Sequence, residues 1–458
     1  DSKSPFATLD LSGNQVKDGF QRNQAGFGLG GALKKDKTFF YINFEQTIDK
    51  KDNLLNVPQL GVNETVTGFN NFTYSSAKID QVWSQRFKSS LRVNHGIFDI
   101  DRQGGGLEGG TLFPSAASAQ KNRTFLVALK NAYVFSSYLT GETNFQTSYF
   151  RWNYREPVNI NSPSVTVQDP SGAVIATVGQ SGAIFDNKEH TNQLQQKLFY
   201  RQGKHSLKFG VEFITSDFNL LGGGNTFGTY TVRLNQAQLD ALKAKGINSS
   251  LDVNDIPADV RVINYDVELQ PNTFGARQNV FSTYLEDIFA VNHKLNLTMG
   301  LRYDYDNLTK GGGSRGDLNN LAPRLAFNYK IDDRNTLRGG YGIFTDKIKY
   351  AIHSDALQFS SSSADFKKQL KELQKLGKLD PNADIDKITF PGNIRATASN
   401  VTYLKGPSYT DLQSRRDRQF VNNMRILNPN GFQNPYSHQV SLGYQNKSDE
   451  DHLFSLDL

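Results

Sequence analysis

Alternation between apolar and polar residues is the dominant pattern of this chain. In residues 295–305, LNLTMGLRYDY, every odd position is apolar or aromatic and every even position is polar or glycine. Such an alternation over about ten residues is typical of a β-strand whose two faces meet unlike surroundings. The short polar turn at residues 292–294 precedes this stretch, and another apolar-rich stretch beginning at Val280 precedes the turn. Together the two stretches predict a β-hairpin.

The same arrangement recurs along the chain and predicts seven hairpins, or fourteen strands. The other tight turns lie at residues 34–37, 85–87, 136–137, 201–204, 332–335 and 446–449. Much longer segments separate one hairpin from the next, so all tight turns should lie at one end of a sheet and all long loops at the other. Long strands with this alternation of connections predict an all-β fold, a transmembrane antiparallel β-barrel.

A soluble β-sandwich or propeller is the alternative, because its strands also alternate. Strands of soluble proteins average about five to six residues, whereas several stretches here are longer than ten residues. Strand length therefore favours the barrel.

The segments between hairpins are predicted to be long extracellular loops. They cover residues 47–72, 99–121, 155–182, 218–277, 307–320 and 346–435. Two of them carry helix patterns, at residues 235–245 and 363–376, each followed by a glycine that suits a helix end. We expect these helices to pack over the mouth of the barrel.

Composition agrees with this architecture. The mean hydropathy is −0.53 and 37% of residues are hydrophobic, as expected if only alternate strand residues meet lipid. No apolar run reaches the roughly 18 residues of a transmembrane helix, and no shift in composition marks a domain boundary. Aromatic clusters at residues 39–41 and 149–154 lie near predicted strand ends, where barrels carry aromatic girdles.

Charge and cysteine content exclude other classes. The net charge is +6, but the basic residues are scattered and form no basic helix or patch, so no nucleic-acid partner is predicted. There are no cysteines, which excludes disulfides and thiolate metal sites. The glycine-rich run at residues 26–31 leads into a turn and another strand instead of a helix, so it does not indicate nucleotide binding.

The sequence contains no recognisable catalytic or metal-binding set, and we predict neither an enzyme nor a cofactor. The seven histidines show no metal-ligand spacing. Glu286 and Asp287 are adjacent but have no histidine near them in the sequence. Two groups of oxygen ligands could in principle bind Ca²⁺, although solvated acids are the simpler interpretation. They are Asp99, Asp101 and Glu108, and Asp304, Asp306 and Asn307.

Four segments, in family order, resemble TonB-dependent outer-membrane receptors, in particular the Oar-like branch. They contain the strings FQRNQAGFGLGG followed by KDKTFF, YLEDIF with LTMGLRYDY, APRLAF with LRGGYGIF, and NPYSHQVSLG. These strings begin at residues 20, 284, 322 and 434. Each match alone is weak, but together they extend over most of the chain.

The resemblance implies a 22-stranded barrel closed by an N-terminal plug and often preceded by a small carboxypeptidase-regulatory-like domain. Such receptors reside in the bacterial outer membrane and import ligands with energy delivered through TonB. On this interpretation residues 1–458 are a partial barrel that lacks the plug, the N-terminal region that contacts TonB, and the last strands. The ligand could be a peptide, a protein or a glycan. A non-energised barrel, such as a porin or a component of a surface assembly, is the alternative.

The alternation also predicts which face of the barrel each residue occupies. Leu295, Leu297, Met299, Leu301 and Tyr303 should face the lipid bilayer. Lumen-facing positions, where ligand passes or a plug docks, should be Arg302, Asp304, Arg324, Asn328 and Arg338. A charge at mid-bilayer on the lipid face costs about 2–4 kcal/mol, so Met299→Arg should damage assembly whereas Asn328→Arg should be tolerated.

Overall fold

The computed structural model describes most of the chain. The described residues are 20–106, 109–181, 184–223, 225, 227–267, 273–310, 315–350, 371, 374–375, 381–382, 384–385, 394–397, 401–407, 433–448 and 452–458.

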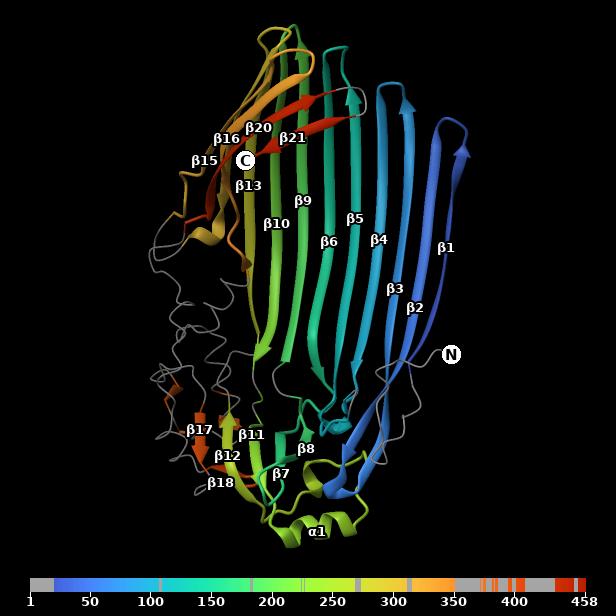
Figure 1. The fold of residues 1–458 in the computed structure, drawn as a ribbon, viewed down its shortest axis with the longest axis vertical. Helices are drawn as coiled ribbons and strands as arrows, with labels where there is room; N and C mark the ends of the chain where they lie inside the picture. Colours follow the sequence, from blue (N-terminus) through green and yellow to red (C-terminus); the bar gives the residue numbers. More distant parts are fainter. Residues whose placement is uncertain are drawn as a thin grey trace.

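Fourteen antiparallel strands form one large sheet (Figure 1). Their order in the sheet follows their order in the chain, apart from strands that belong to a second sheet. The strands are β1 (Gln21–Lys34), β2 (Thr38–Val57), β3 (Val62–Ser84), β4 (Phe87–Arg102), β5 (Ser118–Val134), β6 (Leu139–Pro157), β9 (Ile184–Gln202), β10 (His205–Gly223), β13 (Thr273–Ala290), β14 (Leu295–Asp306), β15 (Leu321–Lys330), β16 (Asn335–Thr345), β20 (Tyr436–Lys447) and β21 (Leu453–Asp457).

The connections lie as the alternation predicted. The seven tight turns are at one end of the sheet, the upper end in Figure 1, and the long connections are at the other. The predicted fourteen strands and their hairpin pairing are therefore confirmed. Among the described residues, β1 pairs only with β2 and β21 only with β20, so both outer edges of this sheet are open.

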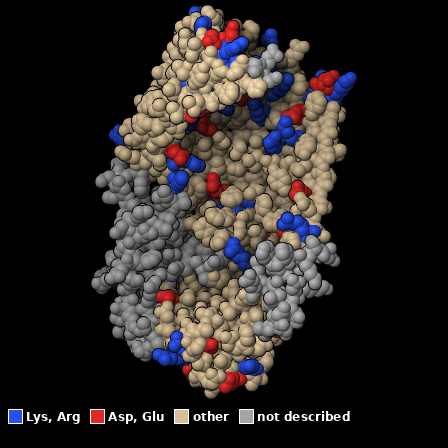
Figure 2. Space-filling model, in the orientation of Figure 1, with Lys and Arg blue, Asp and Glu red and all other residues tan. Residues whose placement is uncertain are grey.

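The two faces of the large sheet differ sharply. Leu301 lies opposite Leu285 on β13, Met299 lies opposite Leu325 on β15, and the two leucines Leu285 and Leu301 are 52% and 50% exposed. We call the face that carries them the apolar face. The other face carries Glu212, Arg302 and Asp304, and we call it the charged face. Figure 2 looks into a hollowed side of the molecule in which acidic and basic side chains gather.

Aromatic rings and ion pairs limit the apolar face at its two ends. Near the tight turns, Phe87 stacks on Tyr133 with ring centroids 5.0 Å apart. Toward the long connections, Arg123 on β5 pairs with Asp99 on β4 at 2.6 Å. Arg123 precedes Tyr133 by ten positions on the same strand. Ten residues span about 33 Å along a strand, and a tilt of about 40° leaves about 25 Å, the height of the apolar band in outer-membrane barrels.

The long connections contain a second sheet that the alternation did not predict. Its five strands come from three separate connections and are ordered β17-β12-β11-β7-β8. They are β7 (Ser164–Gln168), β8 (Val174–Gly179), β11 (Thr229–Arg233), β12 (Arg261–Val267) and β17 (Ile394–Thr397). Strands β7 and β11 run parallel, and the other neighbours are antiparallel. We call this sheet, with the segments packed on it, the cap.

The cap has its own hydrophobic core. Buried side chains from the ends of β2 and β3, from the β4–β5 connection and from the second sheet form one cluster, which includes Leu55, Phe113, Val165 and Tyr265. Four short 3-10 helices, η1 (Pro58–Leu60), η2 (Pro114–Ala116), η3 (Val253–Asp255) and η4 (Asn307–Thr309), lie in the connections. A two-stranded sheet, β18 (Val401–Thr402) with β19 (Gly406–Pro407), adds Tyr403 to the cluster.

The helix predicted at residues 235–245 is present as α1 (Gln236–Ala244). Asn235 and Gln238 form a reciprocal capping box at its start, and Gly246 follows its end with a φ of 68°. The buried Leu239 and Leu242 pack into the core of the cap, and α1 lies at the end of the cap farthest from the large sheet (Figure 1). That it covers the mouth of a barrel stays a prediction. Of the second predicted helix, at 363–376, only residues 371, 374 and 375 are described, and these are helical.

The predicted loop at residues 47–72 is shorter than expected. Strands β2 and β3 continue through most of residues 47–72 and are joined by η1. Alternation ends there because the strands enter the core of the cap, where the successive residues Leu54 and Leu55 are both buried. Burial on both faces removes the period-two signal without ending the strand.

Three buried tyrosines make the stability of the cap sensitive to alkaline pH. Burial raises the pKa of Tyr230 to about 12, and it raises the pKa values of Tyr265 and Tyr403 as well. An unfolded tyrosine has a pKa of about 10. Above that pH the unfolded chain loses protons that the folded cap retains, so stability falls as pH rises.

When the pH is raised from 10 to beyond 12, we therefore expect these three tyrosines to ionise at a higher pH than exposed tyrosines. The cap should lose its structure as they ionise. Ultraviolet absorbance of tyrosinate and near-ultraviolet circular dichroism would follow the two events. Tyr230→Phe should make the cap less sensitive to alkali. Ionisation of all tyrosines near pH 10 with an intact cap would contradict this expectation.

Candidate functional site

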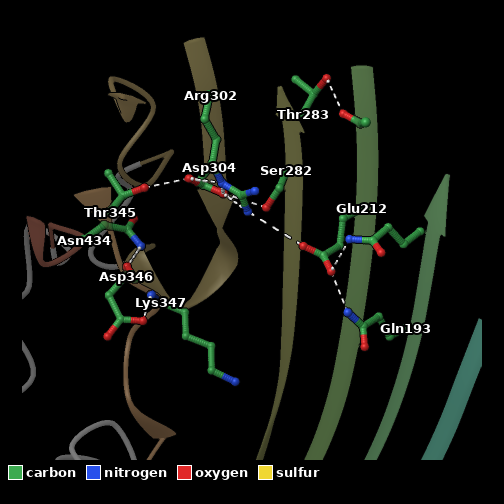
Figure 3. Close-up of polar contacts among 12 residues, drawn as sticks. Gln193, Glu212, Ser282, Thr283, Arg302, Asp304, Thr345, Asp346, Lys347 and Asn434 are labelled. Atoms are coloured by element: carbon green, nitrogen blue, oxygen red, sulfur yellow. Dashed lines mark hydrogen bonds and ion pairs between the residues drawn. The ribbon is translucent and has the colours of Figure 1, made fainter. Parts of the chain in front are cut away.

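An ion-paired network lies on the charged face where β10, β13 and β14 run side by side (Figure 3). Arg302 on β14 donates from Nε to Asp304 at 2.9 Å, and its Nη2 lies 3.7 Å from Glu212 on β10. The network exists because antiparallel register and period-two alternation bring side chains from neighbouring strands to one face. Asp304 also accepts hydrogen bonds from Ser282 and Thr345, both at 2.6 Å.

A cleft of about 270 Å³ lies beside this network. The ring of Tyr284 lies within it, 5.5 Å from Lys208 Nζ and 5.9 Å from Arg302 Cζ. Lys197 and Arg324 add two further cations, and Glu286 adds an acid. Four cations in one cleft, of which Lys208 and Arg302 lie beside its aromatic ring, make this part of the large sheet suited to anionic or π-rich groups.

Glycine at position 210 makes room for the Tyr284 ring. Gly210 lies opposite Tyr284 in the register, and a Cβ atom there would be 2.4 Å from the ring carbons. The contact is with the body of the ring, so an added methyl group would force Tyr284 away from the cations.

We expect Gly210→Ala to destabilise the sheet by about 1–3 kcal/mol, the usual cost of overpacking. Gly300→Ala is the matched control on the same face, because its Cβ would meet its nearest neighbour at 3.7 Å, an ordinary contact. Thermal unfolding of the two full-length variants measures the difference. The readout is the temperature at which each variant loses the gel migration of the folded protein. Equal midpoints would show that the ring does not need the glycine.

Residues 346–350, which we call the strap, cross the charged face at the cap end of β10, β13 and β14. Asp306 Oδ2 accepts a hydrogen bond from the backbone N–H of Ile348 at 2.8 Å and from Gln278 Nε2 at 2.7 Å. Tyr350 stacks on Phe218, with ring centroids 3.9 Å apart. Ile348, Tyr350, Gln278 and Asp306 are all buried. The strap is therefore held against the charged face of the large sheet.

All five residues predicted to face the lumen share one face of the sheet. Arg302 and Asp304 belong to the network. Arg324 lies opposite Gly300, which precedes Arg302 by two residues on β14. The Arg324 guanidinium is 4.3 Å from the centre of the Phe344 ring. Asn328 lies opposite Arg338, which is farther along the sheet and pairs with Asp457 at 2.8 Å. The structure thus groups three of the five closely. That this face encloses a lumen stays a prediction.

The five residues predicted to face lipid also share a face, the apolar one. One detail changes the proposed test, because Met299 lies opposite Asp287 on β13. An arginine at position 299 could pair with this carboxylate, so Leu301, opposite Leu285 and Pro323, is the better position for a charge.

The expectation that Asp287 has no histidine near it was wrong. His205 Nδ1 lies 2.7 Å from Asp287 Oδ2, although the two residues are 82 positions apart. Pairing of β10 with β13 brings them together. The structure therefore shows a His–Asp pair that the sequence did not indicate.

The two acidic groups considered for Ca²⁺ have protein partners instead. Asp99 pairs with Arg123, and Asp101 accepts from the N–H of Phe69. Asp304 and Asp306 are held as described above, and Glu108 lies outside the described residues. Over the described ranges, no group of three or more His, Cys, Asp or Glu side chains could hold a metal ion.

Sequence reasoning missed Glu212, Tyr284 and the strap as parts of the site. Tyr284 stands on a strand with strong alternation, and its place opposite Arg302 could have been derived from the hairpin register. Glu212 and the strap depend on contacts between segments far apart in the chain, and no local pattern marks them.

Comparison with known proteins identifies a matching family model and similar structures. The model described as "Outer membrane beta barrel domain" matches residues 53–314 and 306–457. No curated protein matches the sequence. None of the helices in the described ranges has the length and apolar character needed to cross a membrane.

Several solved structures are similar to this chain at low sequence identity. The outer membrane transporter YddB from Escherichia coli aligns with a TM-score of 0.56 and 14% identity, over 94% of this chain and 45% of that protein. The siderophore receptor PirA from Acinetobacter baumannii aligns at 0.47 and 12%, over 94% and 48%. A mutant ferric enterobactin receptor, PfeA, from Pseudomonas aeruginosa aligns at 0.47 and 10%, over 96% and 50%. This chain thus spans about half the length of the structures it matches.

Proposed function

Since this chain belongs to the family of outer membrane β-barrel domains, we propose that it forms part of the wall of a TonB-dependent transporter that imports a ligand. The family places the protein in the bacterial outer membrane. One observation carries the proposal. The large sheet exposes an apolar face about as high as a membrane core, and its other face carries a network of charged residues.

In this proposal the complete barrel contains strands in addition to the fourteen of the large sheet. In hydrocarbon an open strand edge leaves backbone N–H and C=O groups unpaired, so a spanning sheet must close on itself. The free edges of β1 and β21 are the places where further strands would pair. We propose that residues 1–458 are a partial barrel, completed by other strands and by a plug and an N-terminal domain of a longer protein.

Within that barrel, Arg302, Asp304, Arg324, Asn328 and Arg338 would face the lumen. Their common face and the cleft around Tyr284 support this proposal. There they would contact the plug or the passing ligand, which could be a peptide, a protein or a glycan. The TonB partner would bind the N-terminal region, and the apolar face would contact the lipid bilayer.

Two measurements on the full-length protein test the proposal. In a planar bilayer with KCl, a plugged transporter should show little ion conductance until the plug is removed. The periplasmic domain of TonB should bind the purified protein. Steady conductance of the intact protein without TonB binding would favour a diffusion porin. Neither conductance nor TonB binding, even after removal of any plug, would favour a surface-assembly component.

A further inference from the structure

Six tight turns of the described chain share one backbone hydrogen bond. In each, the residue immediately before the outgoing strand accepts, on its carbonyl, from an N–H of the next hairpin. In the first turn, for example, Lys37 accepts from Val82. The six accepting residues are Lys37, Arg86, Tyr138, Lys204, Lys294 and Arg334. Because the bond recurs, these residues occupy equivalent positions at the end of the large sheet.

Five of these six equivalent positions carry a cation, and we call the five the basic row. Lys37, Arg86, Lys204 and Arg334 are exposed, and Lys294 is half-buried. Neighbouring strands are about 4.8 Å apart and the turns recur at every second strand, so neighbouring positions are about 10 Å apart. The basic row therefore extends along the end of the sheet that lies uppermost in Figure 1.

Carboxylates do not neutralise the basic row. Asp36, Asp332 and Asp333 lie in the same turns, but Asp333 pairs with Lys330. Over the described residues, none of the five cations forms an ion pair with a carboxylate. Lys204 and Lys294 each donate from Nζ to one backbone carbonyl of the next turn, at 2.7 and 2.9 Å. An ammonium group has three donors, so both lysines keep donors for an anionic partner.

The basic row lies where the apolar face ends. Arg86 directly precedes Phe87, whose ring stacks on Tyr133. The ring of Trp83 stacks on Phe87 with centroids 6.3 Å apart and is 62% exposed. Tyr138, at the sixth equivalent position, is half-exposed. Tryptophan and tyrosine are enriched at the boundary between membrane and water, so the cations next to them lie at the level of lipid headgroups.

The shape of the basic row favours an extended anionic surface as its partner. Its members come from separate turns and lie outside the cleft around Tyr284. Cations about 10 Å apart suit many anionic groups side by side better than one small anion. An acidic protein would bury an apolar core beside such cations, but the proposed function assigns the adjoining apolar face to lipid. A phospholipid places its acyl chains on that face and its phosphate at the cations.

We propose that the basic row binds the phosphate groups of anionic phospholipids in the membrane leaflet at the tight-turn end of the sheet. The inference rests on the proposed function for the contact between the apolar face and the bilayer. With phosphates bound along its end, the sheet is held at a fixed depth in the membrane.

Quenching of Trp83 fluorescence in the full-length protein tests this proposal. The protein is reconstituted in vesicles of phosphatidylcholine and phosphatidylglycerol, of which one or the other carries brominated chains, and Trp83→Phe gives the background. Phosphatidylglycerol should bind beside Trp83 about fivefold more tightly than phosphatidylcholine, as expected for about one cation at a membrane surface. Lys37→Gln combined with Arg86→Gln should make the two lipids bind about equally.

Two double variants are the controls. Lys37→Arg combined with Arg86→Lys keeps the charges and should keep the preference. Lys243→Gln combined with Lys245→Gln removes two exposed cations from the cap and should also keep it. Gel migration of the folded protein before heating confirms that each variant has assembled.

Equal binding of the two lipids by the unaltered protein would overturn the proposal. So would a preference that survives Lys37→Gln with Arg86→Gln, or one that the cap variant loses equally. Equal lipid binding together with binding of soluble polyglutamate, lost in Lys37→Gln with Arg86→Gln, would assign the basic row to an acidic protein. Quenching of Trp83 by neither lipid would overturn both this proposal and the membrane contact of the apolar face. Failure of TonB binding would overturn only the transport proposal.

Discussion

Leu301→Arg should prevent most of the full-length protein from assembling in the outer membrane. Leu301 is central in β14, half-exposed on the apolar face, with Leu285 and Pro323 opposite it on the neighbouring strands. A charge at the bilayer midplane of a barrel costs about 2–4 kcal/mol. The measurement is the fraction of membrane-inserted protein that migrates as a folded barrel before heating.

Asn328→Arg and Met299→Arg are the controls for this prediction. Asn328 lies on the charged face, where water would solvate an arginine, so assembly should be nearly normal. Met299→Arg should be intermediate, because Asp287 lies directly opposite and can pair with the new charge. If Leu301→Arg and Asn328→Arg assemble equally well, the assignment of the two faces is wrong.

Asp306→Ala should release the strap and lower the stability of the cap end of the sheet by about 3–5 kcal/mol, as expected when a buried charged hydrogen-bond acceptor is removed. Asp306 is 1% exposed and accepts from Gln278, from the N–H of Ile348 and from the N–H of Leu308. Alanine would remove the acceptor of the buried N–H groups of Ile348 and Leu308, while Gln278 Nε2 would keep only its hydrogen bond to the carbonyl of Ile348. Limited proteolysis within residues 346–350 and the thermal midpoint of the full-length protein would measure the effect.

Two further variants serve as controls for this prediction. Asp306→Asn should lose less stability, because its amide oxygen can still accept from Gln278 and Ile348. Asp333→Ala removes a carboxylate whose side chain is 99% exposed in a tight turn, and it should leave the thermal midpoint nearly unchanged. Proteolysis of the strap that is equally slow in Asp306→Ala and the unaltered protein would show that other contacts hold it.

The large sheet could be predicted because its information is local. In residues 295–305 each side chain takes its face from the pleat alone, and the turn at 292–294 sets the partner strand. The common face of Arg302, Asp304 and Arg324 follows from the same two features. The sequence therefore predicts that Arg302 and Asp304 lie together, but it does not predict the contact with Glu212 on β10.

The cap could not be predicted, for two physical reasons. Its strands are short, as in Ser164–Gln168, and are buried among other cap residues, so they carry little periodic signal. Their pairing is also non-local, since β7 runs parallel to β11 from a different connection. The same reason explains the error at Asp287, whose partner His205 is distant in sequence but adjacent in the sheet.

Residue order by itself determined the strands, their hairpins and the side of the sheet on which each residue lies, because pleating and turn geometry act over a few positions. Only the tertiary structure decided how the long connections fold together and how the strap is held by Asp306. Those contacts depend on which distant segments exclude water from one another, and no short stretch of sequence encodes that choice.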